Sequence, residues 1–130
     1  MKMKLEAAGH EVYLPNCITN PNAEAEAKLL GSQQHAEFKS TMYRQSAQIT
    51  SSMDAILVLN YTKDGVDGYV GGATFLEMYD AFKLGKAIYM CNNVAPSILE
   101  DEIRGFSPTI IHGDISRIHN NLASIERSLR

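Results

Sequence analysis

A carboxylate that follows shortly after a pair of glycines is the part of this sequence best suited to chemistry. Gly71 and Gly72 follow a polar loop and open a segment of helical periodicity, and Glu77 lies in its second turn. Glycines let a ligand approach the backbone closely, and the free N–H groups of a helix start attract phosphate or another anion. Ala73 and Ala81, four residues either side of Glu77, are small enough to leave room for a ligand. The pattern indicates a site for a nucleotide or a sugar phosphate.

Polar residues around this segment are candidates for ligand contacts. The apolar run at residues 55–60 is typical of a buried strand, and it ends at Asn60. Open parallel sheets bind ligands at the carboxyl ends of their strands, so Asn60 is predicted to contact the ligand. Tyr61 and Tyr69 are suited either to stacking on a base or to packing within the loop. Thr74 is suited either to a phosphate or hydroxyl contact or to capping the helix.

Two aspartates in the loop between this strand and this helix are the candidate acids. Asp64 precedes Gly65 and Asp67 precedes Gly68, and Asp-Gly pairs are typical of tight turns. Turn formation is the simpler interpretation of both aspartates. The alternative is that one of them donates a proton to a leaving group.

The rest of the sequence alternates helix and strand, which predicts a parallel sheet with right-handed crossovers. We expect one domain over residues 1–130, a three-layer α/β/α sandwich with a flavodoxin-like or Rossmann-like sheet. Phe75, Leu76, Tyr79 and Phe82 are predicted to form the inner side of the helix that carries Glu77. Strands are expected over residues 11–14, 55–60, 87–91 and 109–112, and helices over residues 1–8, 23–30, 32–51, 72–84, 97–104 and 115–129.

The start of the chain differs from that of a complete doubly wound domain. The sequence opens within a helical segment, so the first strand, which is usually central in such folds, is expected to be missing from this chain. A gap at that place would leave apolar faces and a strand edge to be covered. We therefore expect a homo-oligomer, a dimer or a larger assembly.

Composition excludes several classes of protein. The formal net charge is −3 with a pI of about 5.8, which does not favour a nucleic-acid partner. No apolar run approaches the length of a membrane span, and the first residues have no apolar core of a signal peptide. Cys17 and Cys91 lie far apart, so a cytoplasmic protein with reduced thiols is expected. The four histidines show no metal-ligand spacing, and no metal site is predicted.

Three segments together resemble the nucleoside 2-deoxyribosyltransferase-like superfamily, which includes the deoxynucleoside 5′-monophosphate N-glycosidases. They are DAILVL at 54–59, GATFLEM at 72–78 and LGKAI at 84–88. The segment GHEVYLP at 9–15 is similar to the second strand of that family. The resemblance covers most of the chain and implies a Rossmann-like fold without its first strand. It also implies a nucleoside or nucleotide as substrate and no cofactor.

The resemblance implies a chemical role for Glu77. In this family a glutamate at its position is the nucleophile that attacks C1′ of the sugar as the base leaves. A carboxylate below C1′ stabilises the oxocarbenium-like transition state or forms a glycosyl ester, and the leaving base needs a proton. The sugar then passes to another base or to water. The expected function is cleavage or transfer of the N-glycosidic bond of a (deoxy)nucleoside or its monophosphate.

Two departures from the family pattern keep an alternative open. Transferases of this family carry an aspartate where Asn60 stands, and another immediately before the nucleophile helix, where Gly71 stands. An asparagine orients a base or a hydroxyl but supplies no acid. The alternative is a non-catalytic protein that binds a nucleotide or nucleotide sugar and has lost its acid and base residues. A third interpretation is a shortened structural form that is stable only as an oligomer.

Overall fold

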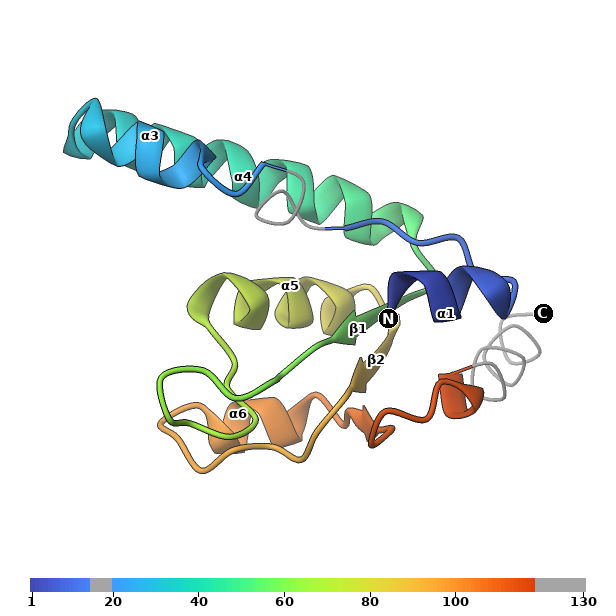
Figure 1. Cartoon of the computed structure of the whole chain (residues 1–130). Coiled ribbons are helices and arrows are strands. Elements are labelled where there is room, and N and C mark those ends of the chain that lie inside the picture. Colours follow the sequence, from blue (N-terminus) through green and yellow to red (C-terminus); the bar gives the residue numbers. More distant parts are fainter. Residues whose placement is uncertain (15–19, 119–130) are drawn as a thin grey trace. The chain divides into compact units, whose positions relative to one another are not determined.

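The computed structural model of the chain describes residues 1–14 and 20–118 (Figure 1). Contacts divide the chain into two compact units, Met1–Gln48 and Ile49–Arg130. The first unit holds α1 (Lys2–Ala7), α3 (Ala23–Leu29) and most of α4 (Ser32–Ser52), which continues into the second unit. The second unit holds a parallel sheet with helices. The protein is therefore a mixed α/β protein, as the alternating pattern predicted.

In the first unit, α3 and α4 are joined through one carboxylate. Gly31 separates the two helices at the predicted place. Glu24 of α3 places its Oε1 3.0 Å from Nε2 of His35 and 3.3 Å from Nζ of Lys39. Because His35 and Lys39 lie one turn apart on α4, a single acidic group contacts two successive turns of the neighbouring helix.

The prediction of a strand over residues 11–14 is wrong, because the structure forms no strand there. Glu11, Tyr13 and Leu14 are exposed, with the side chain of Tyr13 at 57% and that of Leu14 at 37% of full exposure. A segment that buries so little apolar surface gains little from joining a sheet. Among residues 1–14 and 20–118, no strand pairs with this segment.

The sheet of the second unit has three parallel strands in the order β1-β2-β3. Val58 pairs with Met90, and Met90 pairs in turn with Ile110. The helix α5 connects the first two strands and α6 connects the second and third, which is the predicted order of elements. The bounds are Ala55–Val58 for β1, Gly72–Lys83 for α5, Ala87–Met90 for β2, Glu100–Gly105 for α6 and Thr109–Ile110 for β3.

The core of this unit lies between one face of the sheet and the helices α5 and α6. Side chains alternate along a strand, so even-numbered residues of β1 and β2 point to the same face. Three of them join one buried cluster with residues of both helices. Its members are Val58, Ile88 and Met90 of the strands, Met78 and Ala81 of α5, and Ile103 of α6.

The prediction for the inner side of α5 is confirmed for Phe75, which is half-buried against the core cluster. It is wrong for the other three predicted residues. Met78 and Ala81 are fully buried, whereas Leu76, Tyr79 and Phe82 are 40%, 46% and 50% exposed. Three aromatic rings of α5 gather around Phe106, which follows α6 and itself packs against the core cluster. Ring centroids lie 5.5 Å apart for Phe75 and Phe106, 6.3 Å for Tyr79 and Phe106, and 5.5 Å for Phe82 and Phe106.

Two predicted features lie partly or wholly outside the described residues. The terminal helix over 115–129 is described only to residue 118, where one helical turn has formed at 116–118. Cys17 also lies outside the described ranges. Within those ranges, no helix is both long and apolar enough to cross a bilayer.

Candidate functional site

The candidate site is built on the chain between the end of β1 and the second turn of α5. A short hairpin follows β1: Lys63 and Val66 exchange backbone hydrogen bonds of 3.0 and 2.9 Å. Asp64 and Gly65 form its turn, with φ of 51° and 77°. Two successive positive φ values are typical of the two-residue turn that Asp-Gly favours. The turn-forming interpretation of Asp64 is therefore confirmed.

Asp67 closes the base of the same hairpin. Its Oδ1 accepts a hydrogen bond of 2.7 Å from the Thr62 hydroxyl. The side chains of Asp64 and Asp67 are both exposed. The structure thus assigns a folding role to each aspartate, and proton donation by either one stays a prediction.

Asn60 lies at the carboxyl end of β1, where its side chain is buried and fully engaged with the end of β2. It is 1% exposed. Nδ2 donates to the carbonyl oxygens of Asn92 at 2.8 Å and Asn93 at 3.3 Å, and Oδ1 accepts from the Asn92 N–H at 2.8 Å. Asn92 Nδ2 donates back to the Asn60 carbonyl at 3.1 Å. Asn60 therefore ties the ends of two neighbouring strands together, while direct contact with a ligand stays a prediction.

Gly68 is a second point at which the hairpin meets the end of β2. A Cβ at this position would lie 2.6 Å from the Asn93 carbonyl oxygen, and φ is 71°. Both the close approach and the positive φ require glycine. The sequence interpretation had assigned Gly68 only to a turn. Its contact with Asn93 joins residues far apart in the chain, so no local pattern could have revealed it.

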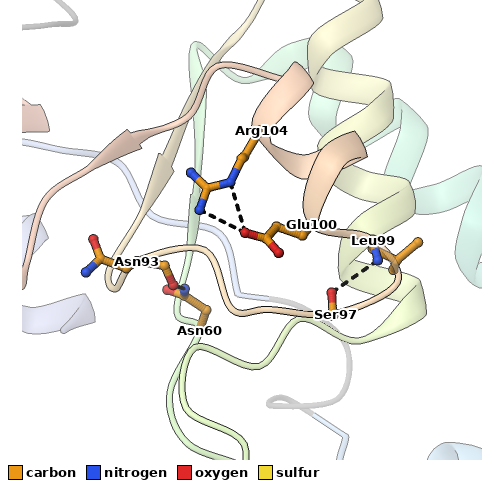
Figure 2. Close-up of polar contacts among 6 residues, drawn as sticks. All are labelled: Asn60, Asn93, Ser97, Leu99, Glu100 and Arg104. Carbon is orange, nitrogen blue, oxygen red and sulfur yellow. Dashed lines mark hydrogen bonds and ion pairs between the residues drawn. The ribbon is translucent and has the colours of Figure 1, made fainter.

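The loop that receives these contacts leads directly into α6. Figure 2 shows Asn60 beside Asn93 and the chain running on to Ser97 and α6. The Ser97 hydroxyl accepts a 3.1 Å hydrogen bond from the Leu99 N–H just before the helix starts. Within α6, Arg104 pairs with Glu100 at 3.0 Å. The loop is thus bonded to Asn60 at its start and ends in a hydrogen-bonded turn before α6.

Tyr61 extends from the end of β1 and lies beside Cys91 at the end of β2. The ring is 51% exposed, so part of it is available to a ligand. Partial burial raises the pKa of the Tyr61 phenol above its usual value, and the neighbouring Cys91 sulfur adds to that shift. The phenol is therefore protonated at neutral pH.

Tyr69 borders the start of α5. Its ring would lie 3.5 Å from a Cβ added to Gly71, which is the N-cap residue, and the Lys63 ammonium lies 5.3 Å from the ring centroid. A Cβ on Gly72 would meet nothing within 4 Å. No side chain caps this helix start, so its first N–H groups have no capping partner among the described side chains.

Glu77 lies on α5 at the margin of its buried side. Thr74 precedes it by three residues and Ala81 follows it by four, so the three residues form one stripe along the helix. Thr74 and Glu77 are half-buried, while Ala81 and the adjoining Met78 are fully buried. The stripe therefore runs from the open helix start into the core. Thr74 makes no side-chain capping bond at the start of α5.

The structure places the predicted residues along one continuous stretch of chain. Asn60 and Tyr61 follow the end of β1, and the two aspartates lie in the hairpin. The remaining four lie in the first two turns of α5 or just before it: Gly71, Gly72, Thr74 and Glu77. The residues that the sequence interpretation missed are Gly68, Asn92 and Asn93, which connect this stretch to the end of β2. No group of three or more His, Cys, Asp or Glu side chains suited to a metal ion occurs in the described ranges.

Comparison of the chain with known proteins found no matching family model, no matching curated protein and no matching solved structure. The assignment of function therefore depends on the residues themselves and on the resemblance that their pattern carries.

Proposed function

We propose that this protein cleaves or transfers the N-glycosidic bond of a (deoxy)nucleoside or its monophosphate, with Glu77 as the nucleophile. One observation carries the proposal. Glu77 is half-buried on α5, one turn beyond Thr74, and the helix begins at a glycine pair immediately after the hairpin that follows β1. A carboxylate so placed combines a restricted environment with an open helix start nearby.

The proposed chemistry needs three functions from the chain. The Glu77 carboxylate attacks C1′, the bond from C1′ to the base nitrogen breaks, and the base takes up a proton as it leaves. Asp67 and Asp64 are the candidate donors of that proton. Thr74, Gly71 and Gly72 would bind sugar hydroxyls or a 5′-phosphate. Water or a second base then attacks C1′ of the glycosyl ester and frees Glu77.

The wider expectations belong to the same proposal. The family is the nucleoside 2-deoxyribosyltransferase-like superfamily, which the segments at 54–59, 72–78 and 84–88 resemble. The fold would be a three-layer α/β/α sandwich, in which helices cover both faces of the sheet. The chain would act without a cofactor, as a cytoplasmic homo-oligomer that binds neither nucleic acid nor membrane. The free, buried thiol of Cys91 supports a reducing compartment.

A non-catalytic nucleotide or nucleotide-sugar binding protein is the second candidate. The observation that favours it concerns the group that would donate a proton to the leaving base. Asn60, which stands where a transferase has an aspartate, uses its amide to hold backbone groups of Asn92 and Asn93. Such a protein would bind a nucleotide without releasing the base.

The experiment is a base-release assay with purified chain and a panel of deoxynucleosides and their monophosphates, with and without a second free base. Free base is followed by chromatography. Glu77→Ala is compared with Glu102→Ala, which replaces an exposed glutamate of α6. Release that is lost in Glu77→Ala and kept in Glu102→Ala supports the enzyme, and exchange into the second base identifies a transferase. Thermal stabilisation by a nucleotide without release supports the binding protein instead.

A further inference from the structure

The strongest unassigned feature of the second unit is the set of contacts between two loops at the carboxyl edge of the sheet. We use the name edge latch for Asn60, Gly68, Asn92 and Asn93. Asn60 and Gly68 stand at the two ends of the hairpin, and both contact the Asn93 carbonyl oxygen or its neighbour. The hairpin is thus hydrogen-bonded to the loop after β2 at one end and approaches it closely at the other.

The hairpin carries two exposed tyrosines, one at each end, and the ring of the second, Tyr69, borders Gly71 at the start of α5. Tyr61 immediately follows Asn60, and Tyr69 immediately follows Gly68. The two tyrosines are 51% and 37% exposed, although their neighbours Asn60 and Gly68 are buried. Each buried contact of the latch therefore has an exposed aromatic ring directly attached to it.

We propose that the edge latch makes Asn60 and Gly68 positioning residues, which hold Tyr61 and Tyr69 in place to bind the flat base of a nucleoside. The ligand class rests on the proposed function, whereas the latch itself does not. Rings held by a rigid backbone lose little conformational freedom on binding, and an aromatic face is a suitable surface for stacking any base. Fixing of the rings before binding then affects affinity for the nucleoside more than the chemical step at Glu77.

The exchange of backbone hydrogens tests the latch without any ligand. The Asn92 N–H lies beyond the end of β2, yet it donates to the buried Asn60 side chain. We expect its exchange with solvent to be slow in the wild-type chain, measured residue by residue by NMR. Exchange at the rate of an exposed loop amide would overturn the proposal directly, whatever the behaviour of any variant.

Three variants separate the latch from general stability. Asn60→Asp keeps the shape of the side chain but replaces the donor Nδ2 with an acceptor oxygen that faces two carbonyl oxygens. Gly68→Ala places a Cβ against the Asn93 carbonyl oxygen. Both should speed exchange about tenfold to a hundredfold in residues 61–70 and 91–95 together. Gly65→Ala is the matched control, because Gly65 also has a positive φ, 77°, but a Cβ there meets nothing within 4 Å. It should affect residues 61–70 alone.

The outcomes are distinct. Faster exchange confined to both loops in either latch variant supports the proposal. Faster exchange in one loop only, or a similar increase throughout β2 and α5, overturns it. If Asn60→Asp does not fold, Gly68→Ala, which lies outside every strand, decides alone, and the Asn92 amide of the wild-type chain remains a test.

The base-release assay tests the positioning role. In Gly68→Ala we expect KM for a nucleoside to rise about tenfold with kcat within about twofold of the wild-type value, whereas Glu102→Ala, at an exposed residue of α6, keeps both. A fall in kcat with KM unchanged would contradict the assignment to base binding. If the wild-type chain releases no base from any substrate, the proposed function fails while the exchange result still decides the latch.

Discussion

Asn60 and Asn92 bind each other in both directions: the Asn92 N–H donates to Asn60 Oδ1 at 2.8 Å, and Asn92 Nδ2 donates to the Asn60 carbonyl at 3.1 Å. Parallel strands end at the same edge of a sheet, and here the second residue beyond each strand takes the place of further ladder bonds with its side-chain amide. The arrangement satisfies backbone groups that would otherwise be buried without partners.

Removal of the Asn60 amide should therefore be costly. Asn60→Ala leaves the carbonyl groups of Asn92 and Asn93 and one N–H without their partner, and we expect the free energy of unfolding to fall by about 2–3 kcal/mol. Asn93→Ala is the matched control, because Asn93 takes part through its backbone carbonyl and its side chain is exposed. It should change stability by less than about 0.5 kcal/mol. Urea denaturation of both variants measures the difference, and equal losses would contradict a role for the Asn60 side chain.

Replacement of Met78 tests which side of α5 faces the core. Met78 is fully buried, whereas Leu76 on the same helix is 40% exposed. We expect Met78→Ala to lower the free energy of unfolding by about 2–5 kcal/mol, because it leaves a cavity between β1, β2 and α5. Leu76→Ala should lower it by less than about 1 kcal/mol. The reverse order in thermal or urea denaturation would restore the side of the helix that the sequence predicted.

The stability of the first unit should depend on pH in the acid range because of the Glu24 carboxylate. The hydrogen bond with His35 is the main cause of a lowered pKa for Glu24, and Lys39 adds to it. A carboxyl group whose pKa is lower in the folded chain than in the unfolded chain stabilises the folded state at pH values above its ordinary pKa of 4.5. The stabilisation is lost as the pH falls through the lowered pKa.

An NMR titration of the Glu24 carboxyl carbon checks this expectation. Its midpoint should lie below the ordinary value in the wild-type chain and move upward in His35→Gln. Lys39→Gln should produce a smaller upward movement, because the hydrogen bond with His35 has the larger effect. A midpoint that is the same in His35→Gln as in the wild-type chain would show that the contact between Glu24 and His35 does not persist in solution.

A small external nucleophile should replace the Glu77 carboxylate. In a chain that releases base, Glu77→Ala should lower kcat by at least about 10³-fold. Azide or formate at high concentration should restore part of the release, because either anion fits the space left by the side chain and attacks C1′ in its place. The glycosyl azide or formate ester is then the product to identify. Loss of activity without such rescue would assign Glu77 to binding rather than to nucleophilic attack.

The sequence predicted most of the second unit because its signals there are local. The apolar runs at 55–60 and 87–91 are typical of strands covered on their faces, and β1 and β2 lie within them. Asp64 and Gly65 predicted their own turn, since the preference for positive φ belongs to those two residues. In the first unit Gly31 likewise predicted the break between α3 and α4.

The rest depended on partners far away in the chain. Every candidate for the inner side of α5 is apolar or aromatic, so periodicity could not choose between Met78 and Tyr79. The rings of Tyr79 and Phe82 contact Phe106, a residue beyond α6 that packs at the margin of the core, and they stay about half exposed. The role of Asn60 depends on Asn92, which is 32 residues later, and no spacing rule connects such a pair. The segment 11–14 was predicted as a strand, but no strand in the part of the chain that the structure describes pairs with it.

The position of Cys91 makes its thiol a probe of local opening at the carboxyl ends of β1 and β2. Its side chain is 5% exposed, its N–H donates to the Val58 carbonyl at 2.9 Å, and it directly precedes Asn92. A thiol reagent reaches the sulfur only when this corner of the protein opens, so the rate of alkylation counts openings of the native chain. With Cys17 replaced by serine, a single mass increment would report how often the two strands part at their carboxyl ends.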